Sequence, residues 1–220
     1  NEPSLRRRIA SSNTSFSTAP MTTISLALPD SSLDQIFSAA RTYPRFLDRP
    51  VDDVMLRRLY DLFKWGPTSM NCQPARVVFV RGAEAKERLR PALSPGNVEK
   101  TMAAPVTAIV ALDSTFHEFL PTQFPANPGA AGLFASNATL ARDTAVRNSA
   151  LQGAYLMLAA RALGLAVGPM SGFDPALVNQ AFFTDGRWQV NFLVNLGWGD
   201  PSGLHPRGPR LPFEEVVRIL

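Results

Sequence analysis

The chain has 220 residues, of which 45% are hydrophobic and 18% are charged. This length suits one domain with a sizeable core, and the hydrophobic content excludes an intrinsically disordered chain. No run is apolar over enough residues to cross a bilayer, so we expect no membrane partner.

The net charge of +4 and the isoelectric point near 9.7 raise the question of a nucleic-acid partner. Arg6, Arg7 and Arg8 supply much of this charge, and the other arginines are scattered without an aromatic-basic platform. We therefore expect no nucleic-acid partner. The single cysteine, Cys72, and only two histidines exclude an intramolecular disulfide and leave a metal site without its usual ligands. This usage suits a reducing, cytoplasmic location, and we expect no metal.

The first residues differ in composition from the rest. Residues 1–20 are rich in Ser, Thr, Asn and Arg, lack an apolar run and so do not form a secretory signal; Met21 follows them. We expect residues 1–30 to be a disordered leader or an extension added to the natural protein, with translation starting at Met21. A transit peptide is the alternative. The domain itself is expected over residues 31–220.

Apolar residues at helical spacing predict two helices early in the domain. The first begins near Ser32 and runs to Ala40, and the second begins at Asp52 or Asp53 and is stopped by Gly66-Pro67. Further along, β-branched and aromatic residues predict strands over residues 75–81 and 105–112, separated by a short charged helix over residues 83–93.

The second half of the chain contains the longest expected helix, residues 141–163, and a central strand over residues 189–197. Between the strand over residues 105–112 and this helix, the apolar residues of 113–135 follow neither helical nor strand spacing. A loop of that length is often a functional lid. Helices and strands are interleaved, so the sequence predicts an α+β or α/β domain.

Four segments carry polar and basic residues at expected turns. Arg41 and Thr42 suit a phosphate, since a guanidinium gives paired donors and the hydroxyl adds another. The turn over residues 66–74 offers two hydroxyls and two carboxamides to a polar heterocycle. Residues 168–174 allow close backbone approach to a flat ligand, and Arg207 or Arg210 offers a second phosphate contact. Each segment has an alternative without a ligand: in the same order, a solvated loop, a capped turn, a helix-to-helix connector and a surface loop.

Five motifs in this order resemble the nitroreductase family of FMN enzymes. They stand as Ala40-Arg41-Thr42 with Phe46 and Arg49-Pro50-Val51, then Pro67 to Pro74, Asn97-Val-Glu-Lys100, Pro169 to Asp174, and Arg210-Leu211-Pro212. The resemblance covers residues 33–220. The phrase Asp-Arg-Pro-Val-Asp-Asp, among others, is similar to the RutE-like branch of malonic semialdehyde reductases.

The resemblance implies an α+β, nitroreductase-like three-layer sandwich, with a mainly antiparallel sheet flanked by helices. It also implies a domain-swapped-type homodimer with FMN in two interface clefts. The subunit's own FMN would be bound by Arg41, Thr42, Asn97, Lys100, Pro169, Met170, Ser171, Gly172 and Arg210. The FMN held mainly by the other subunit would be reached by Pro67, Thr68, Ser69, Asn71 and Gln73.

Two positions depart from the family pattern. Ala40 stands at the first basic position, and Pro44 stands where relatives often place Lys or Arg over the ring. Lys100 would then do more to stabilise negative charge at N1 and O2 of the reduced flavin. No side chain is required as a nucleophile.

The resemblance further implies ping-pong hydride transfer from NADH or NADPH, through FMN, to a small-molecule acceptor. The expected acceptor is an aldehyde acid such as malonic semialdehyde, giving 3-hydroxypropionate, with Arg142, Arg147 or the lid binding its carboxylate. One alternative is a broad nitro/quinone reductase. Another is a flavin-binding sensor without turnover.

Overall fold

The computed structural model describes residues 26–220. Met21 and most of the extension expected over residues 1–30 lie outside the described residues. The centre of the fold is a four-stranded sheet in the order β1-β2-β4-β3. Every neighbouring pair is antiparallel, which confirms the expected α+β fold with an antiparallel sheet. The strands are β1 (Ala75–Val80), β2 (Val106–Asp113), β3 (Ala166–Met170) and β4 (Trp188–Gly197).

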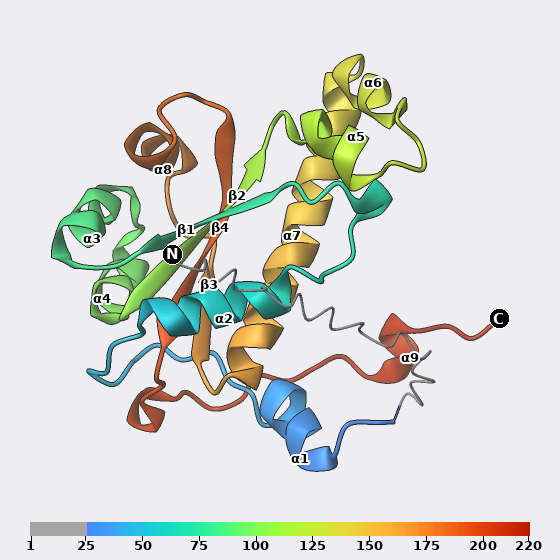
Figure 1. Ribbon diagram of the computed structural model, residues 1–220. Helices are drawn as coiled ribbons and strands as arrows, with labels where there is room; N and C mark the ends of the chain where they lie inside the picture. The colour runs from blue at the N-terminus through green and yellow to red at the C-terminus, as the bar shows by residue number, and fades with distance from the viewer. Residues whose placement is uncertain (1–25) are drawn as a thin grey trace, which may run out of the picture.

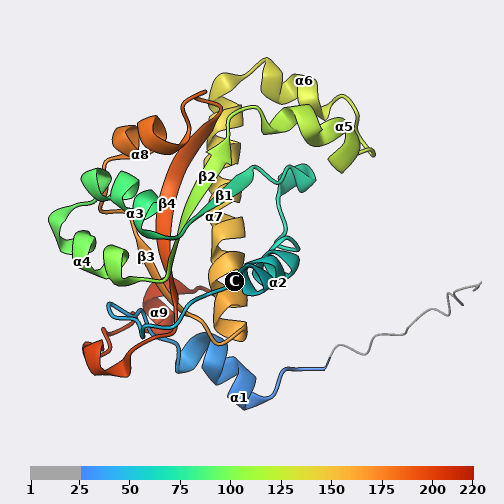
Figure 2. The same ribbon diagram turned by 60° about the vertical axis from the view of Figure 1, so that its left-hand side comes forward.

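Helices cover both faces of this sheet, so the domain has three layers (Figures 1 and 2). On one face, α2 (Asp53–Phe63) and α7 (Ala138–Ala162) bury Leu59 and Leu156 against sheet residues that include Val110. The other face is covered by α3 (Ala83–Leu89), α4 (Pro95–Ala103) and α8 (Pro175–Phe182). All eight residues of β2 are buried, because this strand is central and covered on both faces.

Local capping explains where the main helices begin. The Asp52 carboxylate accepts a hydrogen bond of 2.8 Å from the Met55 backbone N–H, so α2 begins at Asp53 as expected. The Asn137 side chain caps α7 in the same way through Leu140, at 3.0 Å. This cap places the start of α7 three residues before the expected Ala141.

Other elements differ from the sequence-based expectation. The first helix is split into α1 (Asp30–Leu33) and the π-helical η1 (Asp34–Ser38). Residues 168–174, for which a helix-to-helix connector was the alternative, begin inside β3 and lead into α8. The sequence did not predict α4. Residues 113–135 are not an irregular loop. The short helices there are η4 (Phe116–Phe119), α5 (Leu120–Gln123) and α6 (Ala130–Ala135).

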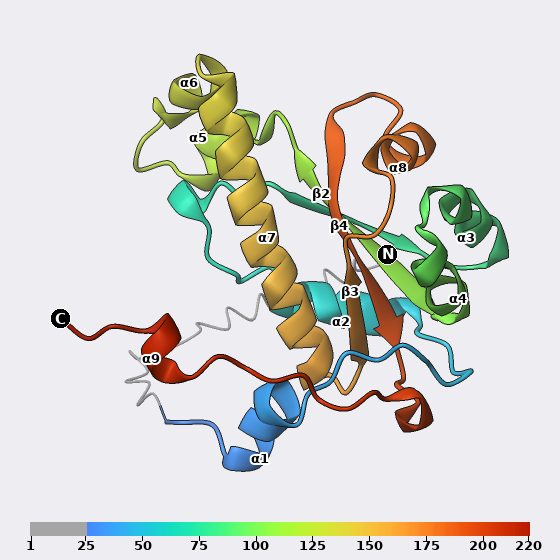
Figure 3. The ribbon, with the colours of Figure 1, turned by 180° about the vertical axis from the view of Figure 1, so that it is seen from behind.

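The remaining elements are short. They are η2 (Ser69–Asn71), η3 (Arg90–Ala92), η5 (Pro201–Gly203) and α9 (Phe213–Val216). The last of these lies in a tail that leaves the body of the domain, and no residue from 205 to 220 is buried (Figure 3). Among the described residues, no helix combines the length and apolarity that a membrane span requires.

The short helices after β2 are anchored to the sheet by Asp113, a fully buried carboxylate at the end of β2. It pairs with Arg76 at 2.7 Å and with Arg187 at 3.0 Å. Burial alone would raise the pKa of Asp113, but bonds from Arg187 and the Thr115 backbone and the charges of both arginines outweigh it. The net pKa is therefore lowered, so the carboxylate stays ionised and keeps holding β1, β2 and the segment before β4 together.

A second buried polar cluster joins the sheet to α3 and α4. The Lys86 ammonium donates to the Thr101 carbonyl at 2.7 Å and to the Thr107 hydroxyl at 2.6 Å. The Thr107 hydroxyl donates to Asn195 at 2.8 Å, and the Asn195 amide donates to the Thr101 hydroxyl at 3.2 Å. Lys86 is 4% exposed, and burial lowers its pKa to about 8. We call these four residues the Lys86 network.

The depressed pKa of Lys86 predicts that stability rises with pH. Its folded value of about 8 lies below the ordinary 10.5, so between these values the unfolded chain binds more protons. Relative to a Lys86→Met variant, the wild-type free energy of unfolding should rise by about 3 kcal/mol from pH 7 to pH 11, at about 1.4 kcal/mol per pKa unit. Urea denaturation of both proteins at each pH measures this difference. If the unfolding free energies of both proteins changed with pH in the same way, the lowered pKa of Lys86 would be contradicted.

Candidate functional site

A cavity of about 730 Å³ lies where η1, the end of α7 and the C-terminal loop meet. We call it the basic cavity, because Arg, Lys and His residues line it and no described Asp or Glu does. Figure 3 shows that α1, the end of α7 and the chain before α9 lie side by side at this end of the molecule. Its basic lining residues are Arg41, Lys100, Arg161, His205, Arg207 and Arg210.

The cavity brings together five of the residues expected to bind the subunit's own cofactor. Arg41, Thr42, Lys100, Pro169 and Arg210 all line it, although they come from four separate segments. The Arg41 guanidinium donates to the His205 carbonyl, and Thr42 forms a parallel bridge with Val167 of β3. These contacts hold the segment after η1 between the sheet edge and the C-terminal loop.

The C-terminal loop is held to the same segment by a second arginine. Arg207 donates to the Ala40 carbonyl at 3.1 Å, and Arg210 donates to the Gly208 and Pro209 carbonyls at 3.1 and 2.9 Å. A guanidinium carries five N–H donors, so each arginine retains donors for an anion. Arg207 and Arg210, the two candidates for the second phosphate contact, thus both line the cavity.

The remaining expected contacts flank the cavity on α4 and the end of β3. Asn97 lies one turn before Lys100, and its amide donates to the Gly172 carbonyl at 2.7 Å. A Cβ at Gly172 would lie 2.5 Å from the Asn97 amide nitrogen, so this close approach requires glycine. Ser171 beside it is exposed. The Met170 side chain is buried in the core and accepts a weak bond from Thr101, which leaves only its backbone for a ligand.

Sequence reasoning missed Arg161, which also lines the basic cavity. It lies in the last turn of α7, where a basic side chain is ordinarily explained by the negative end of the helix dipole. That explanation gave no reason to single it out. Only the three-dimensional structure indicates a role for Arg161, because η1 and the C-terminal loop meet at this turn of α7.

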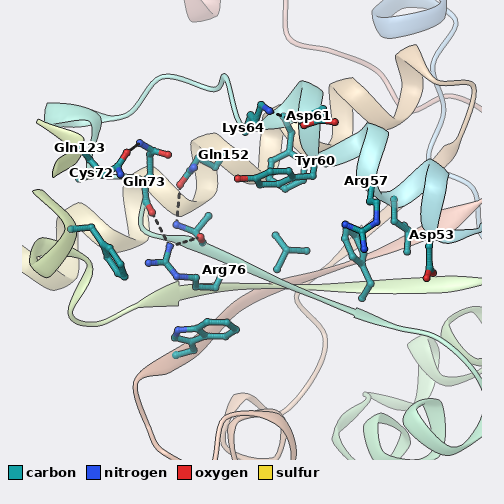
Figure 4. A pocket seen from close by; sticks show the side chains of 17 residues that line it. Asp53, Arg57, Tyr60, Asp61, Lys64, Cys72, Gln73, Arg76, Gln123 and Gln152 are labelled. Carbon is teal, nitrogen blue, oxygen red and sulfur yellow. Dashed lines mark hydrogen bonds and ion pairs between the residues drawn. The ribbon is translucent and has the colours of Figure 1, made fainter. Parts of the chain in front are cut away.

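The turn over Pro67–Gln73 lies elsewhere in the protomer, beside a groove between α2 and β1 (Figure 4). This α2–β1 groove has a volume of about 950 Å³, and its lining includes Tyr60, Gln73, Arg76, Gln123 and Gln152. Gln73 bonds to Gln123 at 3.0 Å. The turn is thus joined to the short helices that were expected to form a lid.

The backbone of this turn adopts conformations that most residues avoid. Met70, Asn71 and Gln73 have φ values of 51°, 50° and 40°, in the left-handed region. Surrounding bonds hold them there: Ser69 N–H donates to Asn148 at 2.8 Å, and Gln73 N–H donates to the Thr68 hydroxyl at 3.1 Å. Strain of this kind is concentrated at binding sites, which favours the binding interpretation over an ordinary capped turn.

The two groups of expected FMN contacts therefore lie at different levels of α7. Asn148 of this helix contacts the turn, whereas Arg161, thirteen residues later, lines the basic cavity. At about 1.5 Å of rise per residue, these levels are about 20 Å apart along the helix. A single protomer does not bring both groups to one place.

Of the two arginines suggested for an acceptor carboxylate, neither lines the basic cavity or the α2–β1 groove. Arg142 bonds to Gln189 at 3.4 Å and is exposed, as is Arg147. Arg76 lies in the groove beside Gln73 instead, although part of its charge is already paired with Asp113. Cys72 also lines the groove, but burial raises its pKa to about 11, which excludes a reactive thiolate at neutral pH.

Comparison with known proteins identifies the family. The model of the Nitroreductase family matches residues 26–198. A Burkholderia lata protein is 60% identical over 90% of this chain and all of its own length; one from Stenotrophomonas maltophilia is 58% identical over 89% of this chain and all of its own. Both are provisionally named NADH dehydrogenase/NAD(P)H nitroreductase.

Solved structures share the fold at low sequence identity. A provisionally named nitroreductase from Bacillus subtilis superposes with a TM-score of 0.77 at 21% identity, covering 87% of this chain and all of its own. One from Exiguobacterium sibiricum, solved in complex with FMN, gives 0.76 at 20% identity, covering 84% of this chain and 96% of its own. The chain belongs to the nitroreductase family and is an oxidoreductase of that family.

Proposed function

We propose that this protein is an FMN-dependent NAD(P)H oxidoreductase whose FMN phosphate lies in the basic cavity. The observation that carries the proposal is the lining of that cavity, which gathers cationic side chains from separate segments without a described carboxylate. Uncompensated cations facing one space are costly unless an anion is bound there. A dianionic phosphate is such a ligand.

The cavity also fits the remainder of FMN. Its volume of about 730 Å³ lies in the usual range for cofactor sites, about 300–1,000 Å³. Pro44 and Pro169 give apolar wall, and Lys100 provides a cation beside it. When bound, FMN accepts a hydride from NAD(P)H and passes it on. The chain's own residues orient the cofactor, and Lys100 favours negative charge on it.

We propose malonic semialdehyde as the acceptor, with 3-hydroxypropionate as the product. Its aldehyde carbon would gain the hydride, and its oxygen would take up a proton from solvent. Arg76 and the amides of Gln73 and Gln123 in the α2–β1 groove offer donors to the carboxylate. Broad nitro or quinone reduction is the second candidate, and the names of the close relatives favour it.

The site is completed, in our proposal, by a second copy of the chain. The turn at Pro67–Gln73 would reach the partner's basic cavity, because the two groups lie about 20 Å apart within one protomer. Large apolar side chains stay exposed on α2 and α7, including Leu62 at 44% and Leu151 at 46%, and Trp65 just after α2 is 76% exposed. The two helices pack against each other, and large apolar side chains left exposed on neighbouring helices favour an interface there.

The C-terminal tail supports an exchange between the subunits. Leu211, Phe213, Val216 and Ile219 are at least 56% exposed, although they are apolar. The tail projects from the body, and the outer edge of β1 has no neighbouring strand among residues 26–220 (Figure 1). Exposed strand edges and apolar segments are ordinarily covered, so we propose that the tail packs on the partner.

The phosphate assignment predicts the effect of Arg41→Ala. Loss of one charge-assisted pair should weaken FMN binding at least about tenfold, because such a bond contributes roughly 1.5–3 kcal/mol. The flavin content of the purified variant, measured by absorbance after dialysis, should fall well below that of the yellow wild-type protein. Equal flavin contents would contradict the assignment, and colourless wild-type protein would contradict the proposed function.

The acceptor is tested by anaerobic reduction and re-oxidation. NADH or NADPH should bleach the flavin absorbance, and malonic semialdehyde should restore it with turnover of the nicotinamide. Bleaching without re-oxidation by any acceptor indicates a sensor. A kcat/KM for nitroaromatics or quinones that exceeds that for malonic semialdehyde would replace the first candidate by the second.

The shared site predicts complementation between two defective variants. Arg41→Ala damages the basic cavity, and Gln73→Ala damages the turn that reaches the partner. In a mixed dimer one site carries both defects and the other carries neither, so mixing the subunits should restore turnover above that of either variant alone. Mixing each variant with itself is the control. No gain after subunit exchange, shown by mass spectrometry, would place both residues in one protomer's site.

A further inference from the structure

One cation of the basic cavity belongs to none of the segments that the sequence singles out, and it lies at the end of α7. Arg161 lines the cavity together with Arg41 and Arg210. Its Nη1 donates to the Ile36 carbonyl at 3.2 Å, whereas its Nε is buried without a partner. A buried N–H donor without a partner costs free energy unless a ligand compensates it.

No carboxylate of the described residues faces Arg161. Among residues 26–220 it forms no ion pair, and no described Asp or Glu lines the cavity. Burial accordingly lowers the pKa of Arg161, the direction expected for a cation without a counter-ion. The Arg161 backbone is held in place as well, because its carbonyl accepts a hydrogen bond of 2.7 Å from the Gln35 side chain.

A second lining residue, Ala40, explains which charge Arg161 would supply. Ala40 lines the cavity with a methyl group, and its carbonyl is already bonded to Arg207. The first position of the Arg41-Thr42 segment therefore contributes no cation. Arg161 reaches the same space from a different element, so the charge absent from this segment is provided by α7.

We propose that Arg161 is a binding residue for the phosphate of FMN and takes the place of the cation absent at Ala40. This inference rests on the proposed FMN function. A purely structural role is the competing explanation, because the Ile36 contact also joins α7 to η1. The two roles differ in one respect: a phosphate contact discriminates FMN from riboflavin, which has no phosphate, whereas a structural contact does not.

The test is a titration of flavin-free protein with FMN and with riboflavin, followed by quenching of flavin fluorescence. Arg161→Met should weaken FMN binding at least about tenfold and leave riboflavin binding unchanged. Arg161→Lys, which keeps the charge, should lose less. Arg58→Met is the matched control, since Arg58 is an exposed helical arginine on α2 outside both cavities, and it should bind both flavins as the wild type does.

A second variant tests the exchange of charge directly. Ala40→Arg, added to Arg161→Met, should restore FMN affinity without changing riboflavin affinity. Equal losses for both flavins would show that Arg161 shapes the cavity only, and unchanged FMN affinity would show that it contributes nothing; either result overturns the inference. Wild-type protein that binds neither flavin would overturn the proposed function itself, which separates the two failures. Thermal unfolding of each flavin-free variant checks that it is folded.

Discussion

The length of α7 is the constraint on which the rest of this structure depends. This 25-residue helix packs on one face of the sheet, and it contacts the turn before β1 at one level and lines the basic cavity at another. Asn148 holds the strained turn before β1, and Arg161 lies in the basic cavity. Because a helix is a rigid spacer, these groups stay about 20 Å apart whatever the loops do. A ligand that needs both groups therefore needs two chains.

The sheet that supports α7 combines an apolar interior with one polar cluster. In the Lys86 network, each hydroxyl and amide both donates and accepts, so the cost of burying Lys86 is partly offset. The network joins β2 and β4 to α4, the helix that carries Asn97 and Lys100. A purely hydrophobic contact would permit α4 to slide, whereas directional bonds fix its position relative to β3. The polar core thus positions residues at the edge of the basic cavity.

Elements with a strong local pattern were predictable from sequence, and those that depend on neighbours were not. The helix after Asp52, the strand at Ala75 and the strand at Gln189 follow from a cap or from β-branched residues. By contrast, β3 contains Gly168-Pro169, which indicates a loop. It is a strand because it lies at the sheet edge, where its one strand neighbour is β4 among residues 26–220 and proline is tolerated. Similarly, α4 begins with Pro95-Gly96, and proline suits the first turn of a helix.

The candidate site shows the same division between local and spatial information. Ordered motifs indicated Arg41, Lys100 and Arg210, and the structure brings them to one cavity. Their order could not reveal Arg161, because a cation near a helix end has an adequate local explanation. Arg161 differs from other cations at helix ends because η1, α7 and the C-terminal loop enclose one cavity. The positive charge that lines this cavity is the sum of the side chains from all three elements. A family position such as Ala40 can therefore lose its cation while the cavity keeps one, provided that another element reaches the same volume.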